Sequence, residues 1–439
     1  MSKKISTFQI ILLAVFGAIG VAGILVFALA TAGSGGGGVS PVTIWGTFDA
    51  ATVKEVLRSA AEEDSRLSQV TYVQKDPATF EQDLANALAS GNGPDLFILR
   101  SDEALYDQDK LYVIPYSSLS QSQFQSTFVN AGNTYLSANG VLGLPILVDP
   151  LVLYWNTDDL ATAGIAEPPQ YWNQVPTMTA QLVQEDDAGN LQKEALALGT
   201  YQNITGAKDI LSLLIEQAGG QVVELNAAGQ YVPGLSQGGG ASQAALSALE
   251  FYTEFANPSQ ADYTWNDAQP EASQAFAAGN LAMYIGYASE EPQILAANPN
   301  LSFGAARVPQ VSSTQNSIDA GGAYAIAVAR NSPNLSSALT VAYLIAGAPV
   351  DQALSQALGL PPARRDVIAE STSTVADTQL FNKMALITQT WADPDPSQTG
   401  PIFQAMIEDT DSGALKPQDA IGRADQQIED LLSQDQQSQ

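Results

Sequence analysis

Short β-type runs alternate with amphipathic helical segments from residue 41 onward, and this alternation restricts the fold more than any other feature of the sequence. Residues 41–45 (PVTIW), 69–73 (QVTYV) and 94–99 (PDLFIL) have the composition of strands. The segments between them place apolar residues on one helical face, and we expect the second helix to begin at Asp76-Pro77. Strands that alternate with helices pair in parallel and are covered by helices, so the sequence predicts an α/β fold.

The same alternation resumes in the second half of the chain, which indicates a second α/β domain. A length of 439 residues, of which 45% are hydrophobic, is enough for more than one core. The chain has no short repeat, which excludes solenoid and propeller folds. The apolar spacing predicts a helix that ends at Gly219, helices over residues 244–255, 273–279, 338–346 and 417–432, and strands over residues 281–285 and 323–329.

Acidic residues greatly outnumber basic ones. The chain has 46 Asp+Glu against 17 Lys+Arg, which gives a formal net charge of -29. Such a surface repels phosphate backbones and anionic lipid headgroups. We therefore expect no nucleic-acid partner and no electrostatic binding to a membrane surface.

Cysteine and histidine are both absent. The chain therefore cannot form disulfides, the usual zinc, haem or iron–sulfur ligand sets, or a histidine-dependent catalytic triad. This excludes Ser236 as a nucleophile, although GLSQG (residues 234–238) fits the G-x-S-x-G pattern. Residues 393–397 and 409–411 resemble the start of a calcium loop but lack its glycine and its glutamate, so we expect no metal and no cofactor.

The N-terminus has the features of a membrane-targeting segment. Two lysines precede an uncharged apolar run over residues 8–30, which is long enough for a spanning helix, and a glycine-rich stretch follows. We therefore expect a membrane anchor over residues 1–32, a flexible linker over residues 33–40, and an extracytoplasmic domain after them. An A-x-A sequence at residues 28–30 leaves open a cleaved signal peptide, in which case the protein is secreted or periplasmic.

Ordered short motifs cover nearly all of the chain after residue 40. They include residues 80–96 (FEQDLANALASGNGPDL), 144–156 (LPILVDPLVLYWN), 275–283 (AFAAGNLAM) and 360–365 (LPPARR). No single motif is specific, but the ordered set is. With this set the chain resembles the extracellular solute-binding proteins of ABC importers, in the sugar-type branch that includes the maltose-binding proteins.

The resemblance implies a two-lobed, periplasmic-binding-protein-like fold of type II, in which each lobe is a sheet flanked by helices. By this analogy residues 41–148 plus 322–370 form lobe one, and residues 151–320 plus 371–435 form lobe two. Asp149 would then mark the crossing between two half-strands in different lobes. The resemblance also implies a monomer that holds a carbohydrate between the lobes, closes about its hinge, and docks on the permease subunits of an importer with a cytoplasmic ATPase.

A sugar site needs aromatic rings for the C–H faces of the ligand and carboxylates or amides for its hydroxyls. Three carboxylates, Asp49, Asp102 and Asp149, follow predicted strands, where open α/β sheets hold ligands. The resemblance gives all three as ligand contacts. The alternatives are solvated loop acids at Asp49 and Asp102, and a hinge or capping residue at Asp149.

Aromatic side chains and a glycine pair complete the expected site. Tyr154 and Trp155 are neighbours on a predicted strand, so one faces inward and the other outward. The glycine pair allows the backbone to approach a ligand or to adopt the dihedrals of a hinge, and a tight turn is the plain alternative. Large aromatic residues also serve as core, which is the alternative for each ring. The expected ligand contacts of this group are Trp45, Tyr154, Trp265, Tyr287, Gly321, Gly322, Tyr324, Trp391 and Phe403.

These features predict a binding protein and no enzyme: an extracytoplasmic receptor that captures a sugar or oligosaccharide and delivers it to an ABC permease. Three alternatives stay open. The acidity suits a polyamine or cationic peptide as ligand, the ectodomain could serve a sensor without an importer, and paired carboxylates could serve an anchored glycoside hydrolase. The tyrosines and tryptophans near the expected cleft favour the carbohydrate.

Overall fold

The computed structural model describes residues 39–438 except residues 188–190, 237–239 and 313–316. The chain divides into two units, Met1–Ser40 and Pro41–Gln439. The expected membrane anchor and most of the expected linker lie in the first unit, outside the described residues. Within the described residues, no helix combines the length and the apolar character that crossing a membrane requires.

The main sheet of the second unit has ten strands. They are β1 (Val42–Gly46), β2 (Val70–Gln74), β3 (Leu96–Arg100), β7 (Leu144–Asn156), β8 (Gln184–Glu185), β9 (Leu191–Leu196), β12 (Leu281–Tyr287), β13 (Phe303–Ala306), β14 (Asp319–Val328) and β15 (Thr388–Gln389). Their order is β2-β1-β3-β14-β7-β12-β9-β8, while β13 pairs with β7 and β15 with β14. The sheets that we expected as separate, one in each lobe, are joined through β7 and β14.

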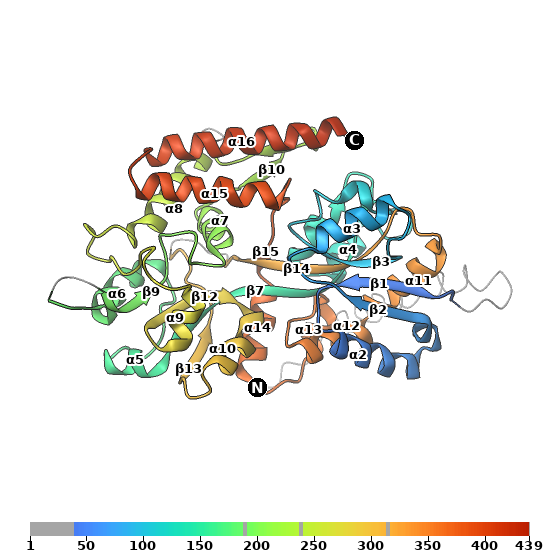
Figure 1. The fold of residues 1–439 in the computed structure, drawn as a ribbon, viewed down its shortest axis with the longest axis horizontal. Coiled ribbons are helices and arrows are strands. Elements are labelled where there is room, and N and C mark those ends of the chain that lie inside the picture. Colours follow the sequence, from blue (N-terminus) through green and yellow to red (C-terminus); the bar gives the residue numbers. More distant parts are fainter. Residues whose placement is uncertain (1–38, 188–190, 237–239, 313–316, 439) are drawn as a thin grey trace, which may run out of the picture. The chain divides into compact units, whose positions relative to one another are not determined.

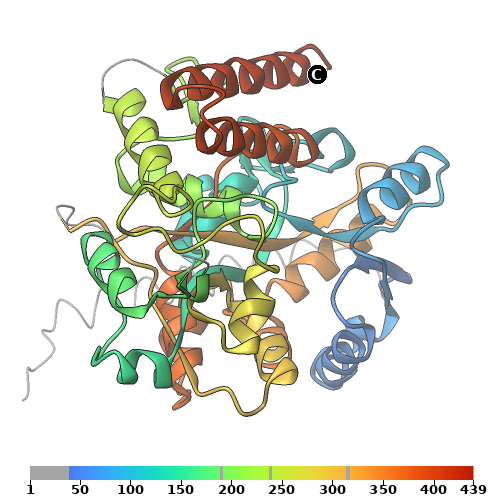
Figure 2. The ribbon, with the colours of Figure 1, turned by 60° about the vertical axis from the view of Figure 1, so that its left-hand side comes forward.

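Two groups of helices flank this sheet and give the unit its two α/β lobes (Figure 1). Around β1 to β3 lie α2 (Ala50–Glu63), α3 (Phe80–Ala89), α4 (Gln121–Thr127), α11 (Leu335–Ile345), α12 (Ala348–Leu358) and α13 (Arg365–Glu370). Around β9, β12 and β13 lie α5 (Thr157–Thr162), α6 (Val175–Leu182), α7 (Ala207–Gln217), α8 (Gly240–Glu254), α9 (Ala272–Ala278), α10 (Glu291–Ala297), α14 (Ala376–Ala385), α15 (Pro396–Asp411) and α16 (Pro417–Ser438). The last two, in red, lie side by side in both views (Figure 2).

Two small sheets complete the strands that the structure describes. One joins β4 (Ile114–Pro115), β5 (Leu136–Ser137) and β6 (Gly140–Val141), and the other is the hairpin of β10 (Val223–Leu225) and β11 (Tyr231–Pro233). Both are built from strands of two or three residues, which explains why hydrophobic periodicity gave no sign of them.

The first part of the chain confirms the predicted βαβαβ arrangement. β1 pairs in parallel with β2 on one side and with β3 on the other. The predicted start of the second helix is wrong by a few residues, because α3 begins at Phe80. The carboxylate of Asp76 accepts a hydrogen bond from the backbone N–H of Ala78 at 2.9 Å, so it caps a turn that precedes the helix.

The segment around Asp149 forms one unbroken strand, so the expectation of two half-strands is wrong. The reason is that β7 finds antiparallel partners along its whole length. Its first half, up to Pro150, pairs with β14, and its second half, from Leu151, pairs with β12. The change of partner falls at the position where we expected the break. β7 is therefore one continuous strand that runs through both lobes.

A cluster of rings forms the core of the lobe that contains β12. Tyr154 stacks on Tyr284 with ring centroids 6.2 Å apart, and Phe276 and Phe303 pack around it. Tyr154 is completely buried, whereas its neighbour Trp155 is only partly buried. The predicted alternation of the two rings across the strand is confirmed.

Candidate ligand-binding site

A cavity of about 340 Å³ lies where the end of β3, the middle of β7, the end of β12, the start of β14 and one face of α7 meet. We refer to it as the central cavity. Its volume is near the lower end of the range of about 300 to 1,000 Å³ that small-molecule sites occupy. Because elements of both lobes line it, a bound molecule would contact both lobes at once.

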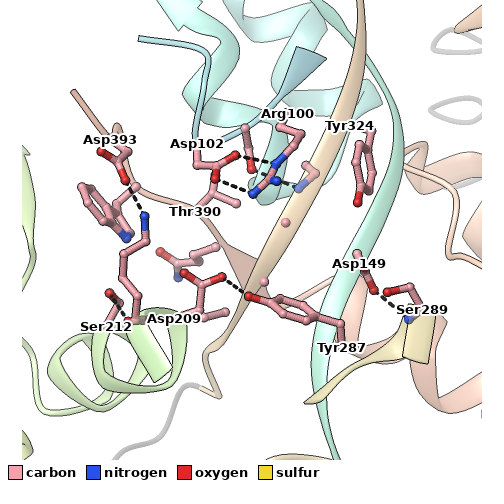
Figure 3. Close-up of a pocket in the computed structure, with 18 of the residues that line it drawn as sticks. Arg100, Asp102, Asp149, Asp209, Ser212, Tyr287, Ser289, Tyr324, Thr390 and Asp393 are labelled. Atoms are coloured by element: carbon pink, nitrogen blue, oxygen red, sulfur yellow. Dashed lines mark hydrogen bonds and ion pairs between the residues drawn. The ribbon is translucent and has the colours of Figure 1, made fainter. Parts of the chain in front are cut away.

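On the side of β3, Arg100 and Asp102 form a two-point ion pair. Arg100 Nε donates to Asp102 Oδ1 at 3.0 Å, and Arg100 Nη2 donates to Asp102 Oδ2 at 2.6 Å (Figure 3). This pairing orients both side chains and balances the charge of the carboxylate. The ring of Tyr324 also lines the cavity, and Phe48 contacts it edge-on with ring centroids 4.9 Å apart.

On the opposite side, α7 presents a polar face to the central cavity. Lys208, Ser212 and Glu216 follow one another at intervals of four residues and therefore lie along one side of the helix, with Asp209 beside them. The other side of α7 is buried in the lobe. Packing of this apolar side fixes the position of the helix. The polar side chains on the opposite side therefore face the central cavity.

Lys208 is held between an acid and an aromatic ring. Its Nζ donates to Asp393 Oδ2 at 2.7 Å and lies 5.4 Å from the ring centre of Trp391. Asp393 also accepts from the hydroxyl of Thr399 at 2.8 Å. Burial alone would lower the pKa of Lys208, but the neighbouring carboxylates, Asp393 above all, outweigh it and raise the pKa. The lysine is therefore cationic and paired.

Two further carboxylates accept hydrogen bonds from neutral donors. Asp149 Oδ1 accepts from the backbone N–H of Ser289 at 2.9 Å, and Asp209 Oδ2 accepts from the hydroxyl of Tyr287 at 2.7 Å. Burial raises the pKa of Asp149 to about 6, and burial also raises the pKa of Asp209. Both carboxylates thus reach across from one strand or helix to the next and tie the cavity wall together (Figure 3).

The charges of the central cavity do not balance. Its two cations, Arg100 and Lys208, are paired with Asp102 and Asp393. Three acids that line the same cavity, Asp149, Asp209 and Glu216, take part in none of the ion pairs among the described residues. Together with the rings of Tyr287, Tyr324 and Trp391, they offer acceptors for hydroxyl or amino hydrogens beside flat apolar faces.

Gly321 and Gly322 form part of the cavity wall for two different reasons. Gly321 has a φ of 154°, and a Cβ placed on it would come within 2.3 Å of the carbonyl oxygen of Asp149. A Cβ on Gly322 would meet no atom within 4 Å. The first glycine is needed for the close contact of β14 with β7, whereas the second keeps the space in front of the strand open.

The structure brings seven of the twelve sequence-predicted residues to the central cavity. They are Asp102, Asp149, Tyr287, Gly321, Gly322, Tyr324 and Trp391. They come from five separate segments of the chain, so their convergence follows from the tertiary fold and not from any local pattern.

Three of the predicted aromatics do not reach the cavity, because they are completely buried. Tyr154 belongs to the ring cluster and donates to the carbonyl oxygen of Tyr287 at 2.9 Å. Trp265 donates through Nε1 to Asn203 at 3.2 Å. Phe403 stacks on Trp391 with ring centroids 6.2 Å apart. The last of these therefore supports a cavity residue from behind.

Trp45 and Asp49 lie outside the lining of the central cavity. The ring of Trp45 is covered by Lys75, whose Nζ is 3.6 Å from the ring centre. Asp49 caps α2 by accepting from the backbone N–H of Thr52 at 2.8 Å, a contact that lowers its pKa. These contacts give each residue a structural role.

Sequence reasoning did not select the cavity residues Arg100, Lys208, Asp209, Glu216 and Asp393. For the three on α7 the sequence does carry a signal. The apolar residues of this amphipathic helix recur at helical spacing, and the polar residues between them mark the opposite side of the helix. For Asp393 the sequence carries no such signal, because its partner Lys208 is distant in the chain. The partner of Arg100 is the predicted residue Asp102, only two residues away, but nothing in the local pattern marks the arginine itself.

Comparison with known proteins identifies a family. The sequence model of the bacterial extracellular solute-binding proteins matches residues 59–382, which is well over half of the chain. No curated protein is significantly similar in sequence.

Several solved structures share the fold. A solute-binding protein of an ABC transporter from Thermotoga lettingae, bound with α-D-tagatose, has 21% identity and a TM-score of 0.66, over 90% of this chain and 100% of its own. The GacH receptor of Streptomyces glaucescens, described unliganded and with acarbose, has 18% identity and a TM-score of 0.69, over 90% and 99%. A cyclic α-maltosyl-1,6-maltose binding protein from Arthrobacter globiformis has 17% identity and a TM-score of 0.73, over 90% and 99%.

Proposed function

The chain belongs to the bacterial extracellular solute-binding proteins, and we propose that it captures a sugar or oligosaccharide in the central cavity for delivery to an ABC permease. The observation that carries this proposal is the composition of the cavity wall. Carboxylates and three aromatic rings from both lobes face one space of about 340 Å³. Rings cover the C–H faces of a sugar, and carboxylates accept hydrogen bonds from its hydroxyls.

The size of the cavity favours a small ligand, of one or two sugar rings. Proteins with the same fold were solved with a monosaccharide, tagatose, and with the larger acarbose. Those proteins are distant in sequence, so their ligands support the class of solute and not its identity.

Closure of the lobes is the proposed way in which binding is signalled. We assign residues 41–148 plus 322–370 to lobe one and residues 151–320 plus 371–435 to lobe two. The positions of the helices around the two ends of the main sheet support this division (Figure 1). β7 and β14 pass between the lobes, and hinge motion about such crossings brings two faces of a cleft onto a ligand. Asp149, at the change of partner in β7, is proposed to be both hinge residue and ligand contact.

The remaining parts of the proposal concern location and partners. The apolar residues 8–30 serve as an anchor that keeps the binding unit on the outer side of the membrane, beside the permease and its cytoplasmic ATPase. The receptor works as a monomer and performs no covalent chemistry. The family, whose members bind solutes, supports the assignment as a binding protein.

A titration of the purified protein with mono- and oligosaccharides, polyamines, peptides and amino acids tests the proposal. We expect saturable heat release in calorimetry and a raised melting temperature with one or more sugars. Binding of polyamines or peptides alone would overturn the sugar assignment. Glycoside hydrolysis that is lost when Asp102 or Asp149 is replaced would overturn the assignment as a binding protein.

A further inference from the structure

One carboxylate of the central cavity has no protein partner. Glu216 lines the cavity, and its Oε2 is shielded from solvent yet accepts no hydrogen bond from any of the described residues. Buried polar atoms in native proteins nearly always have partners, so an exception in a binding cavity indicates a function. The other carboxylates of the cavity, those of Asp102, Asp149, Asp209 and Asp393, each accept at least one hydrogen bond from the protein, which makes Glu216 distinct from them.

The position of Glu216 is fixed by the residue that follows it. Gln217 accepts from the indole N–H of Trp172 at 2.6 Å, and its Nε2 donates to the carbonyl oxygens of Pro309 at 3.2 Å and Ile318 at 3.1 Å. The bonds to Pro309 and Ile318 hold the last turn of α7 against the residues that precede β14, and the bond from Trp172 fixes the same side chain from a second segment. Glu216 therefore cannot escape the cavity through fraying of the helix end.

The charges around Glu216 do not compensate it. Burial, with a further contribution from Asp209 on the same helix, raises the pKa of Glu216 to about 7. Asp319 at the start of β14 is completely buried, and burial raises its pKa too, against the opposing effect of Arg307. Lys208, the cation of α7, is held by Asp393.

We infer that the solute carries a protonated amino group and that Glu216 receives it, so that the ligand is an amino sugar or another polyol with an amine. This inference rests on the proposed function and narrows its ligand class. An ammonium group supplies up to three hydrogen-bond donors and a positive charge. It would therefore give Glu216 both the hydrogen-bond donor and the counter-charge that the protein does not supply. The ring of Tyr287 lines the same cavity, and the face of an aromatic ring attracts a cation that lies over it.

A pH signature follows from this arrangement. In the free protein near pH 7 Glu216 is partly protonated, and an ammonium group bound beside it favours the ionised carboxylate. Binding of the amine therefore releases protons near pH 7, and the affinity falls as the pH is lowered to about 5.5. A neutral sugar gives neither effect at Glu216.

The test uses matched ligand pairs on the full-length protein. Glucose, galactose and mannose are each compared with the corresponding 2-amino sugar and its N-acetyl derivative, and short oligosaccharides are compared in the same way. Calorimetry in two buffers of different ionisation enthalpy gives the affinity and the number of protons released. We expect the amine to bind at least about tenfold more tightly than its neutral partner and to release protons.

Two variants assign the preference to Glu216. Glu216→Gln keeps the shape and removes the charge; we expect it to abolish both the preference and the proton release while the melting temperature stays equal or rises. Glu250→Gln removes an exposed charge on α8 and should change neither. A lower melting temperature of Glu216→Gln with an unchanged preference would give Glu216 a structural role and overturn the inference.

The outcomes separate the two proposals. Neutral sugars that bind as tightly as their amino counterparts overturn the inference and leave the proposed function intact. If no carbohydrate binds, with or without an amine, while the protein melts cooperatively, both proposals fail.

Discussion

Gly322 of β14 lies directly opposite Asp149 of β7 in the antiparallel pair. The missing side chain of Gly322 leaves open the space beside the one carboxylate that stands at the change of partner in β7. We expect Gly322→Leu to fill this space, since a Cβ there meets no atom within 4 Å. Binding should weaken by at least about tenfold, with a change in the free energy of unfolding within about 1 kcal/mol. Calorimetry and urea unfolding measure the two quantities.

A matched control for this substitution is Gly422→Leu on the exposed side of α16, where a Cβ also meets no atom within 4 Å. It should leave binding unchanged. Normal affinity in Gly322→Leu would show that the ligand lies elsewhere.

Asp149→Ala separates the two roles proposed for this residue. If the carboxylate accepts hydrogen bonds from the ligand in the closed form, affinity should fall by about 1 to 3 kcal/mol. The matched control is Asp109→Ala, which removes an exposed carboxylate outside the central cavity and should leave the affinity unchanged. Unchanged affinity with a lower melting temperature in Asp149→Ala would leave only the hinge role.

The buried carboxylate of Asp149 also predicts a pH dependence of stability. Its pKa rises from 3.8 to about 6 in the folded protein because of burial, so the folded state binds this proton more tightly than the unfolded chain does. The stability that the group contributes is complete below 3.8 and is lost as the pH rises through about 6. We expect Asp149→Asn, compared with the native protein, to gain about 1 to 3 kcal/mol between about pH 4 and pH 8. Urea unfolding as a function of pH measures the difference, and Asp109→Asn at an exposed position is the control. Parallel curves for Asp149→Asn and the native protein would contradict the prediction.

We expect replacement of the two stacked rings, Trp391 and Phe403, to affect different properties: the first ligand binding, the second stability. Trp391 lines the cavity, so Trp391→Ala should weaken sugar binding by about 1 to 2 kcal/mol. Phe403 is completely buried behind it, so Phe403→Ala should instead lower the free energy of unfolding by about 3 to 5 kcal/mol. Calorimetry and urea unfolding on both variants decide the matter, and the reverse pattern would show that Phe403 is the ligand platform.

Much of the fold could be predicted from the sequence because helices and strands are each marked by a characteristic spacing of apolar residues. The alternation of β runs and helices predicted β1, β2 and β3 as a parallel set, and the pairing confirms it. The continuity of β7 could not be predicted, because Asp149 and Pro150 interrupt the apolar pattern while the partners that preserve the strand, β14 and β12, lie far away in sequence.

The site was less accessible to sequence reasoning than the fold. Aromatic type alone does not tell a ligand platform from a core ring: Trp391 and Phe403 stack on each other, yet only the first lines the cavity. Acids were selected because they follow strands, which found Asp102 and Asp149 but not Asp209 and Glu216 on a helix. The ion pair of Lys208 with Asp393 depends on two segments that only the tertiary fold brings together.

The place of β14 in the main sheet determines how much of the chain must be synthesised before the protein can complete its folding. β14 lies between β3 and β7, although it follows both in the chain. A nascent polypeptide that already contains β1, β2, β3 and β7 therefore still lacks the strand that joins them. The edge of β3 and the first half of β7 stay without this partner until β14 has been synthesised. Neither lobe can be completed vectorially from the N-terminus, so the receptor should acquire its native structure only after nearly the whole chain is available.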